Sequence, residues 1–151
     1  MKQWESVDEV LDFAIEREQE AHDFYQKLAG NVETRWMKET FEQFAREEMG
    51  HKKKLIKVKE GGEMVTSTAK VADLKVGDYL ADVEVRDNLT YQEALILAMK
   101  REKMAFKLYS DIAASVEDAT VRNLFLGLAQ EEAKHKLRFE IEYDERILTE
   151  N

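Results

Sequence analysis

Hydrophobic and polar residues alternate along most of this chain with the 4-3 spacing of long amphipathic helices. The pattern covers four segments, at about 6–29, 34–60, 90–115 and 119–147. Residues with this spacing lie on one face of a helix, and a bundle of four helices buries such faces against one another. The pattern therefore predicts an all-α fold, a four-helix bundle.

The two halves of the chain are related by an internal repeat. A capping box, in which two residues satisfy each other's helix-end groups, begins the first helix at Ser6–Glu9 and the third at Thr90–Glu93, 84 positions later. When 6–55 is aligned with 90–139, 16 of 50 positions are identical, against about 3 expected from composition alone. The repeat predicts two copies of one helical hairpin.

Turns and one long connection separate the predicted helices. We expect the first hairpin, 6–60, to turn at Gly30–Asn31 and the second hairpin, 90–147, to turn near 115–118. The connection between them, 61–89, is long enough to run the length of a helix of about 40 Å. We therefore predict a single domain covering the whole chain, in which a long crossover joins the two hairpins.

Composition changes this picture mainly by exclusion. The 151 residues include no Cys and carry a formal net charge of -9. Without cysteine there can be no disulfide, iron–sulfur cluster or rubredoxin-type iron site, and the acidity argues against nucleic acid or an anionic membrane surface as partner. Met1–Glu5 lacks the apolar run of a signal peptide, and no window approaches about 18 uncharged apolar residues, so we expect a soluble cytoplasmic protein.

Six ionisable residues interrupt the hydrophobic faces of the predicted helices. They are Glu18, Glu48, His51, Glu102, Glu132 and His135. The second and fourth helices each carry a Glu-x-x-His pair, whose members share a helix face because they are three residues apart. In each hairpin the two glutamates lie at a similar distance from the turn, roughly 22 Å along the helix. We therefore expect all six side chains to meet in one layer of the bundle.

Metal ions are the simplest means of stabilising such a layer. Four buried carboxylates would cost several kcal/mol each if they were ionised and unpaired. Two divalent cations would balance the four negative charges, and a set of carboxylates and imidazoles suits iron or manganese, with zinc as a common substitute. We predict that each ion takes one histidine and one glutamate from the first or third helix, while Glu48 and Glu132 bridge the two ions.

The residues beside these six have their own predictions. Glu47 and Glu131 also repeat, but they lie one position off the core face and are not predicted as ligands. Tyr25 and Tyr109 lie one heptad beyond the glutamates of the first and third helices. We expect both phenols to hydrogen-bond ligand carboxylates, as residues around a metal site commonly do. The alternative is that they are core tyrosines with some other acceptor.

These residues, in this order and on these helices, make the chain resemble the ferritin-like diiron-carboxylate superfamily, and the rubrerythrin group in particular. The resemblance covers nearly the whole chain, and the segments 18–25 and 47–51 are typical of rubrerythrins. It implies a ferritin-like bundle with a two-iron site. Two features differ: rubrerythrins usually carry a C-terminal rubredoxin domain, and they tend to have a second glutamate where this chain has Ala105.

The resemblance implies an oxidoreductase in which two iron ions, held by the six residues above, reduce peroxide or dioxygen. We expect electrons to come from a separate donor protein such as a rubredoxin, and we expect a homodimer. Two alternatives remain open. One is a ferroxidase that oxidises ferrous iron for storage in a large assembly, and the other is a non-enzymatic, stress-related protein whose metal site is structural.

Overall fold

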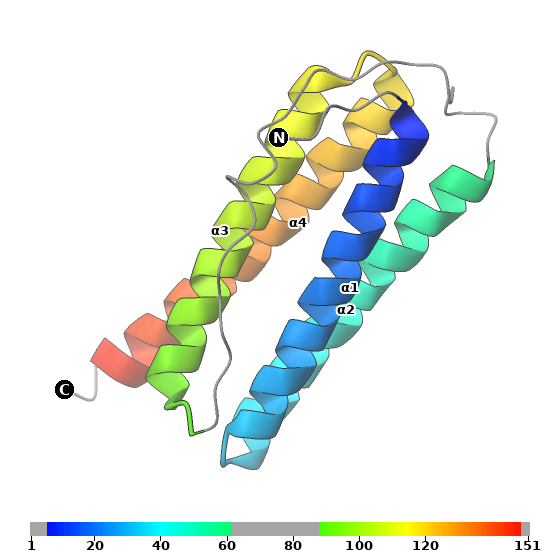
Figure 1. Ribbon diagram of the computed structural model, residues 1–151. Coiled ribbons are helices and arrows are strands. Elements are labelled where there is room, and N and C mark those ends of the chain that lie inside the picture. The colour runs from blue at the N-terminus through cyan, green and yellow to red at the C-terminus, as the bar shows by residue number, and fades with distance from the viewer. Residues whose placement is uncertain (1–5, 62–87, 149–151) are drawn as a thin grey trace.

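The computed structural model describes residues 6–61 and 88–148 (Figure 1). Within these ranges the α-helices are α1 (Val7–Asn31), α2 (Arg35–Gly61), α3 (Tyr91–Ser115) and α4 (Ala119–Tyr143). This confirms the predicted all-α four-helix fold. The predicted crossover falls almost wholly on 62–87, outside the described residues. No helix in the described ranges combines the length and the apolar character that crossing a membrane requires.

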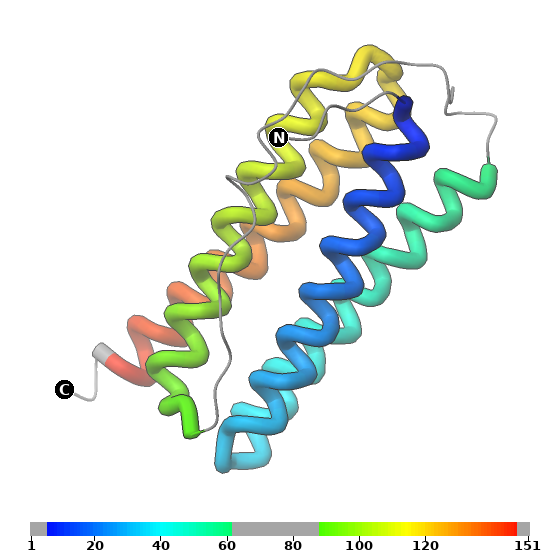
Figure 2. The backbone as a smooth tube through the Cα atoms, in the orientation of Figure 1, coloured from blue at the N-terminus to red at the C-terminus, as the bar shows by residue number. Residues whose placement is uncertain are grey.

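The helices form two antiparallel pairs, α1 with α2 and α3 with α4 (Figure 1). In this view α1 and α3 lie in front of α2 and α4, and the backbone tube of Figure 2 shows the same arrangement. α2 ends at the top of the view and α3 begins at the bottom, so these two helices run in the same direction. These directions are those of two hairpins joined by a long crossover.

The helix bounds repeat together with the sequence. α3 begins and ends 84 positions after α1, and α4 begins 84 positions after α2. Capping side chains fix three of the starts. The Ser6 hydroxyl accepts from the Glu9 N–H at 3.2 Å, Thr90 and Glu93 form the full reciprocal capping box, and Asp118 caps α4. Sequence repetition therefore becomes repetition of the hairpin itself.

One predicted turn is wrong. α1 continues through Gly30 and Asn31 and ends only there, and the chain becomes extended at Val32. The Asn31 side-chain amide donates to the Lys27 carbonyl at 3.0 Å, so it bonds back onto the last turn of the helix. The buried Val32 side chain then holds the turn against the core.

The last helix also differs from the prediction. α4 ends at Tyr143 rather than near Ile147, and a π-helical turn, Asp144–Leu148, follows it. The Asp144 N–H donates to two carbonyls at once, three and four residues earlier. Such shared bonds are common where a helix ends, and the α-helical pattern of hydrogen bonds ends at Tyr143.

The six ionisable residues divide the hydrophobic core into two clusters. One cluster includes Leu11, Leu55, Ile112 and Phe125, and the other includes Leu28, Phe41, Leu95 and Phe139. Both clusters draw side chains from all four helices, so both join the two hairpins. Along every helix the ionisable residues lie between the two clusters. They are therefore held on rigid elements, with packed hydrophobic layers on both sides.

Candidate metal centre

The structure brings all six predicted residues together. Each of the four glutamates and His135 is 1 % exposed, and the His51 side chain is 12 % exposed. Their ligand atoms form two overlapping groups, Glu18–Glu48–His51–Glu132 and Glu48–Glu102–Glu132–His135, and within each group the atoms lie within 4.8 Å of one another. Glu48 and Glu132 belong to both groups. This is the arrangement expected of residues that bridge two neighbouring ions.

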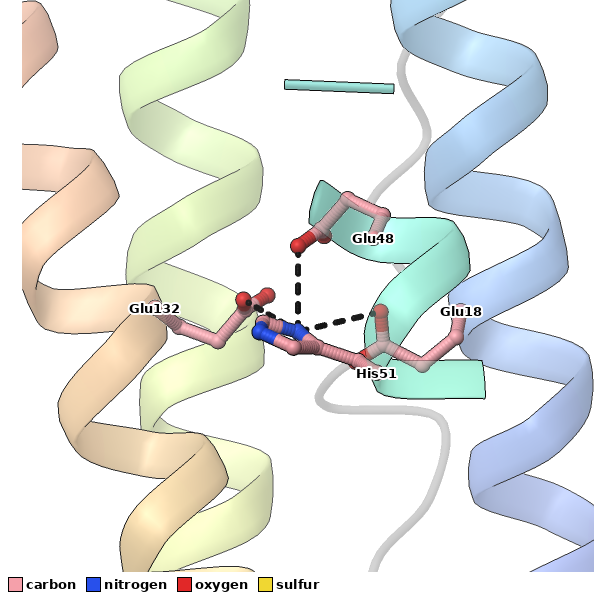
Figure 3. Close-up of side chains that lie close together, drawn as sticks. All are labelled: Glu18, Glu48, His51 and Glu132. Carbon is pink, nitrogen blue, oxygen red and sulfur yellow. Dashed lines mark ion pairs between the residues drawn. The ribbon is translucent and has the colours of Figure 1, made fainter. Parts of the chain in front are cut away.

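The first group is centred on His51 of α2. Its Nδ1 lies 3.2 Å from Glu48 Oε1, 3.3 Å from Glu132 Oε1 and 3.6 Å from Glu18 Oε2. Figure 3 shows these three carboxylates pointing at that nitrogen from α1, α2 and α4. Three helices therefore converge on one point.

The second group repeats this geometry around His135 of α4. Its Nδ1 lies 3.4 Å from Glu48 Oε1, 3.5 Å from Glu102 Oε1 and 3.6 Å from Glu132 Oε1. The edge-to-face contact with Phe44, with ring centroids 4.8 Å apart, packs the imidazole against the core. Both histidines present Nδ1 to the carboxylates, as the internal repeat requires.

Unsatisfied polar atoms show that these residues fit a metal centre. Seven buried side-chain atoms in the described residues have no hydrogen-bond partner, and six of them belong to the six residues, one atom each. They are Glu18 Oε2, Glu48 Oε1, His51 Nδ1, Glu102 Oε2, Glu132 Oε1 and His135 Nδ1. A buried polar atom left unpaired costs about 1–3 kcal/mol. Metal ions would satisfy these oxygen and nitrogen donors together.

Burial and charge repulsion make this layer retain protons when no metal is bound. Burial, and then the carboxylate of Glu18, raise the pKa of Glu48 to about 8, and burial likewise raises the pKa of Glu132 well above its usual range. Burial lowers the pKa of His51, but the neighbouring carboxylates outweigh it and raise that pKa to about 10. The same balance raises the pKa of His135 to about 9. Metal binding would therefore displace protons.

Two buried tyrosines connect the hairpins across the centre. The Tyr25 hydroxyl of α1 donates to Glu102 of α3, and the Tyr109 hydroxyl of α3 donates to Glu18 of α1 at 2.7 Å. Each tyrosine thus holds the glutamate of the other hairpin, a crossing that the sequence does not reveal. Burial and the nearby carboxylates raise the pKa of both phenols well above the usual value, so both remain protonated donors.

Glu47, which the core pattern excludes, contacts the centre from outside. Its Oε1 accepts from His135 Nε2 at 3.0 Å, and its Oε2 accepts from Arg138 at 3.2 Å. A carboxylate on the outer nitrogen orients a histidine so that its other nitrogen faces the metal. Despite its partial burial, these two partners lower the pKa of Glu47. Its side chain reaches across to α4. The sequence marked this position only by its repetition as Glu131, which pairs with Lys134 instead.

The two halves of the centre differ at this contact. Glu131 pairs with Lys134 at 3.6 Å, and in the described part of the chain no carboxylate bonds the outer nitrogen of His51. The ion held with His135 would therefore have an oriented imidazole, while the ion held with His51 would not. The repeat is symmetric in its inner residues and asymmetric around them.

A pocket of about 240 Å³ leads from the surface to the carboxylates. Its walls come mainly from α1 and α3, with Arg17, Ala21, Arg101 and Ala105 among the lining residues. Its inner end is bounded by three of the glutamates, Glu18, Glu48 and Glu132. A small molecule can therefore reach the centre from the side opposite the histidine-bearing helices.

Known proteins resemble this chain in sequence pattern and in fold. The family model described as Rubrerythrin matches residues 9–143. A putative ferritin-like diiron-carboxylate protein from Thermotoga maritima has a similar fold, with a TM-score of 0.76, 20% identity, and coverage of 97% of this chain and 99% of that one. A hypothetical protein from Pyrococcus furiosus matches with a TM-score of 0.67 and 24% identity, over 92% of this chain and 89% of that one. No curated protein matches. Since the family match spans most of the chain, this protein belongs to the rubrerythrin family.

Proposed function

We propose that this protein is a non-haem diiron oxidoreductase that reduces peroxide or dioxygen. The observation that carries the proposal is the pair of overlapping ligand groups that share Glu48 and Glu132. Glu18 and His51 would complete one iron site, and the corresponding residues of the second hairpin would complete the other. When bound, the two irons would supply two electrons by changing between the ferrous and ferric states. Manganese or zinc would fit the same donor set.

The surrounding side chains prepare the site for this chemistry. The two hydrophobic clusters exclude water above and below the layer, which strengthens electrostatic interactions within it. Tyr25 and Tyr109 fix the orientation of the carboxylates that they contact, since each phenol stays protonated. The pocket between α1 and α3 supplies access for a small oxidant. The protein thus positions the ligands, restricts water to the side of the pocket and admits the substrate.

Electrons have to enter from outside this chain in our proposal. The sequence contains no cysteine, so it lacks the thiolates of a rubredoxin-type iron site. A separate donor protein such as a rubredoxin would reduce the centre after each turnover. We also propose that the protein acts as a homodimer, which a sizing column would distinguish from a cage of many subunits.

Peroxide consumption by the reduced, iron-loaded protein tests the proposal. We expect anaerobic loss of H2O2 to be far faster with the original sequence than with Glu48→Ala, which removes a residue shared by both ligand groups. Glu60→Gln removes an exposed charge from the same helix and serves as the matched control. Equal rates for all three proteins would overturn the proposal. Rapid oxidation of ferrous iron by a large assembly, without peroxide turnover, would favour a ferroxidase instead.

A further inference from the structure

The pocket between α1 and α3 is larger than peroxide or dioxygen requires. Its volume is about 240 Å³, whereas one water molecule takes roughly 30 Å³ in the liquid. A two-atom dioxygen molecule therefore fills only a small part of the pocket. Ala21 and Ala105, which correspond in the repeat, leave much of this space open because their side chains are small.

The lining combines apolar side chains with one arginine from each helix, and the acidic Glu20 of α1 also belongs to it. Met104 and Leu108 of α3 add hydrophobic surface beside the two alanines. Arg17 of α1 and Arg101 of α3 also line the pocket, and they too correspond in the repeat. The carboxylates of the metal centre form the inner end. A ligand suited to this lining has a short apolar body and an anionic group.

The two arginines differ in what already holds them. Arg17 contacts Glu20 at 2.8 Å and Glu16 at 3.6 Å, so its charge is balanced. Arg101 has no ion pair among the described residues, and its guanidinium lies over the Phe24 ring, 5.0 Å from the centroid. Once metal ions neutralise the inner carboxylates, Arg101 is the unbalanced charge of the pocket. Its planar guanidinium matches a carboxylate group with two parallel hydrogen bonds.

We propose that this pocket binds a small organic carboxylate, with the carboxylate on Arg101 and the apolar chain between Ala21 and Ala105. The far end of the ligand then faces the metal centre. The inference rests on the proposed centre, because the inner glutamates repel an anion until metal is bound. A small carboxylate would then be a second class of ligand for a centre otherwise suited to peroxide or dioxygen.

Binding to zinc-loaded protein tests this site without any redox chemistry. The probes are butanoate and butanamide, which have similar shape and differ in charge, and the readout is calorimetry. We expect butanoate to bind roughly tenfold more tightly than butanamide, and Arg101→Gln to remove that difference. Lys103→Gln, which removes an exposed charge of α3 outside the pocket, should change neither affinity. Ala105→Leu should weaken both probes by filling the pocket.

Three results would overturn the proposal. They are equal binding of the two probes, equal effects of Arg101→Gln and Lys103→Gln, and loss of butanoate binding in Ala105→Leu but not in Arg101→Gln, which would put the carboxylate on zinc. Zinc does not change its oxidation state, so none of these outcomes bears on peroxide reduction. Conversely, protein that binds butanoate yet consumes no peroxide would contradict the proposed oxidoreductase and not the pocket.

Discussion

Removing the Glu47 carboxylate is expected to weaken the binding of one metal ion and to leave the binding of the other unchanged. Glu47 accepts a hydrogen bond from His135 Nε2 at 3.0 Å, and Arg138 lies 3.2 Å from its other oxygen. The corresponding residue of the second hairpin, Glu131, contacts Lys134 instead. Glu47→Ala should therefore loosen His135, while Glu131→Ala is a control at the equivalent position of the repeat.

The expected loss of metal affinity depends on how exposed the contact between Glu47 and Arg138 is. Loss of a residue that orients a metal-bound histidine typically costs 10–100-fold in metal affinity. The side chains of Glu47 and Arg138 are 33 % and 45 % exposed, so solvent screens their charges and the lower end of that range applies. We expect Glu47→Ala to weaken one ion about tenfold, which corresponds to about 1.4 kcal/mol. Glu47→Gln keeps an acceptor for the imidazole and should lose less.

Calorimetric titration with Zn2+ against a competing chelator measures the two affinities separately. The expected result is two binding events, of which Glu47→Ala weakens only one and Glu131→Ala weakens neither. If Glu131→Ala weakened the second event as much as Glu47→Ala weakens the first, the asymmetry between the two halves would be wrong. If Glu47→Ala bound both ions as tightly as the original protein, the hydrogen bond to His135 would have no orienting role.

The remaining predictions concern stability, measured by urea or thermal unfolding. Tyr109→Phe leaves the buried Glu18 without its hydrogen-bond donor and should lower the free energy of unfolding of the metal-free protein by about 1–3 kcal/mol. Tyr91→Phe removes a less buried hydrogen bond and should lower it by less. Equal losses in the two variants would contradict this prediction. Metal-free protein should lose stability as pH rises from about 4.5 to 10, because the raised pKa values of Glu48 and His51 make the native state bind more protons than the unfolded state over that window. A stability that rises with pH in the absence of metal would refute the raised values. Phe125→Ala, at a fully buried position, should cost about 3–5 kcal/mol.

The meeting of the six ionisable residues could be predicted because two independent patterns agree on them. The 4-3 spacing places Glu18 and Glu102 on core faces, and the repeat places them at equal heights beside the two Glu-x-x-His pairs. The same repeat also indicates where the first turn lies. α3 ends at Ser115, and the position 84 residues earlier is Asn31, where α1 ends. Gly30 therefore predicted the end of α1 less well than the alignment of α1 with α3 does.

Other features depend on how the hairpins lie against each other, and the residue pattern along a single helix does not specify that arrangement. Val10, Phe24 and Leu108 are buried although they lie off the 4-3 positions, because a helix in a bundle packs against more than one neighbour and buries a wider stripe. The crossed bonds of Tyr25 and Tyr109 join different hairpins. Both the wide core and the crossed bonds follow from packing between the halves.

Metal content tests the central claim most directly. Protein loaded anaerobically with Fe2+ and then freed of loosely bound metal should contain two ions per chain, and Glu48→Ala, which removes a residue shared by both ligand groups, should contain fewer. Removing the metal should lower the melting temperature, because the buried donor atoms lose the ions that would satisfy them. A chain that holds no tightly bound metal with all six residues intact, or that melts at the same temperature once metal loss is verified, would contradict the account.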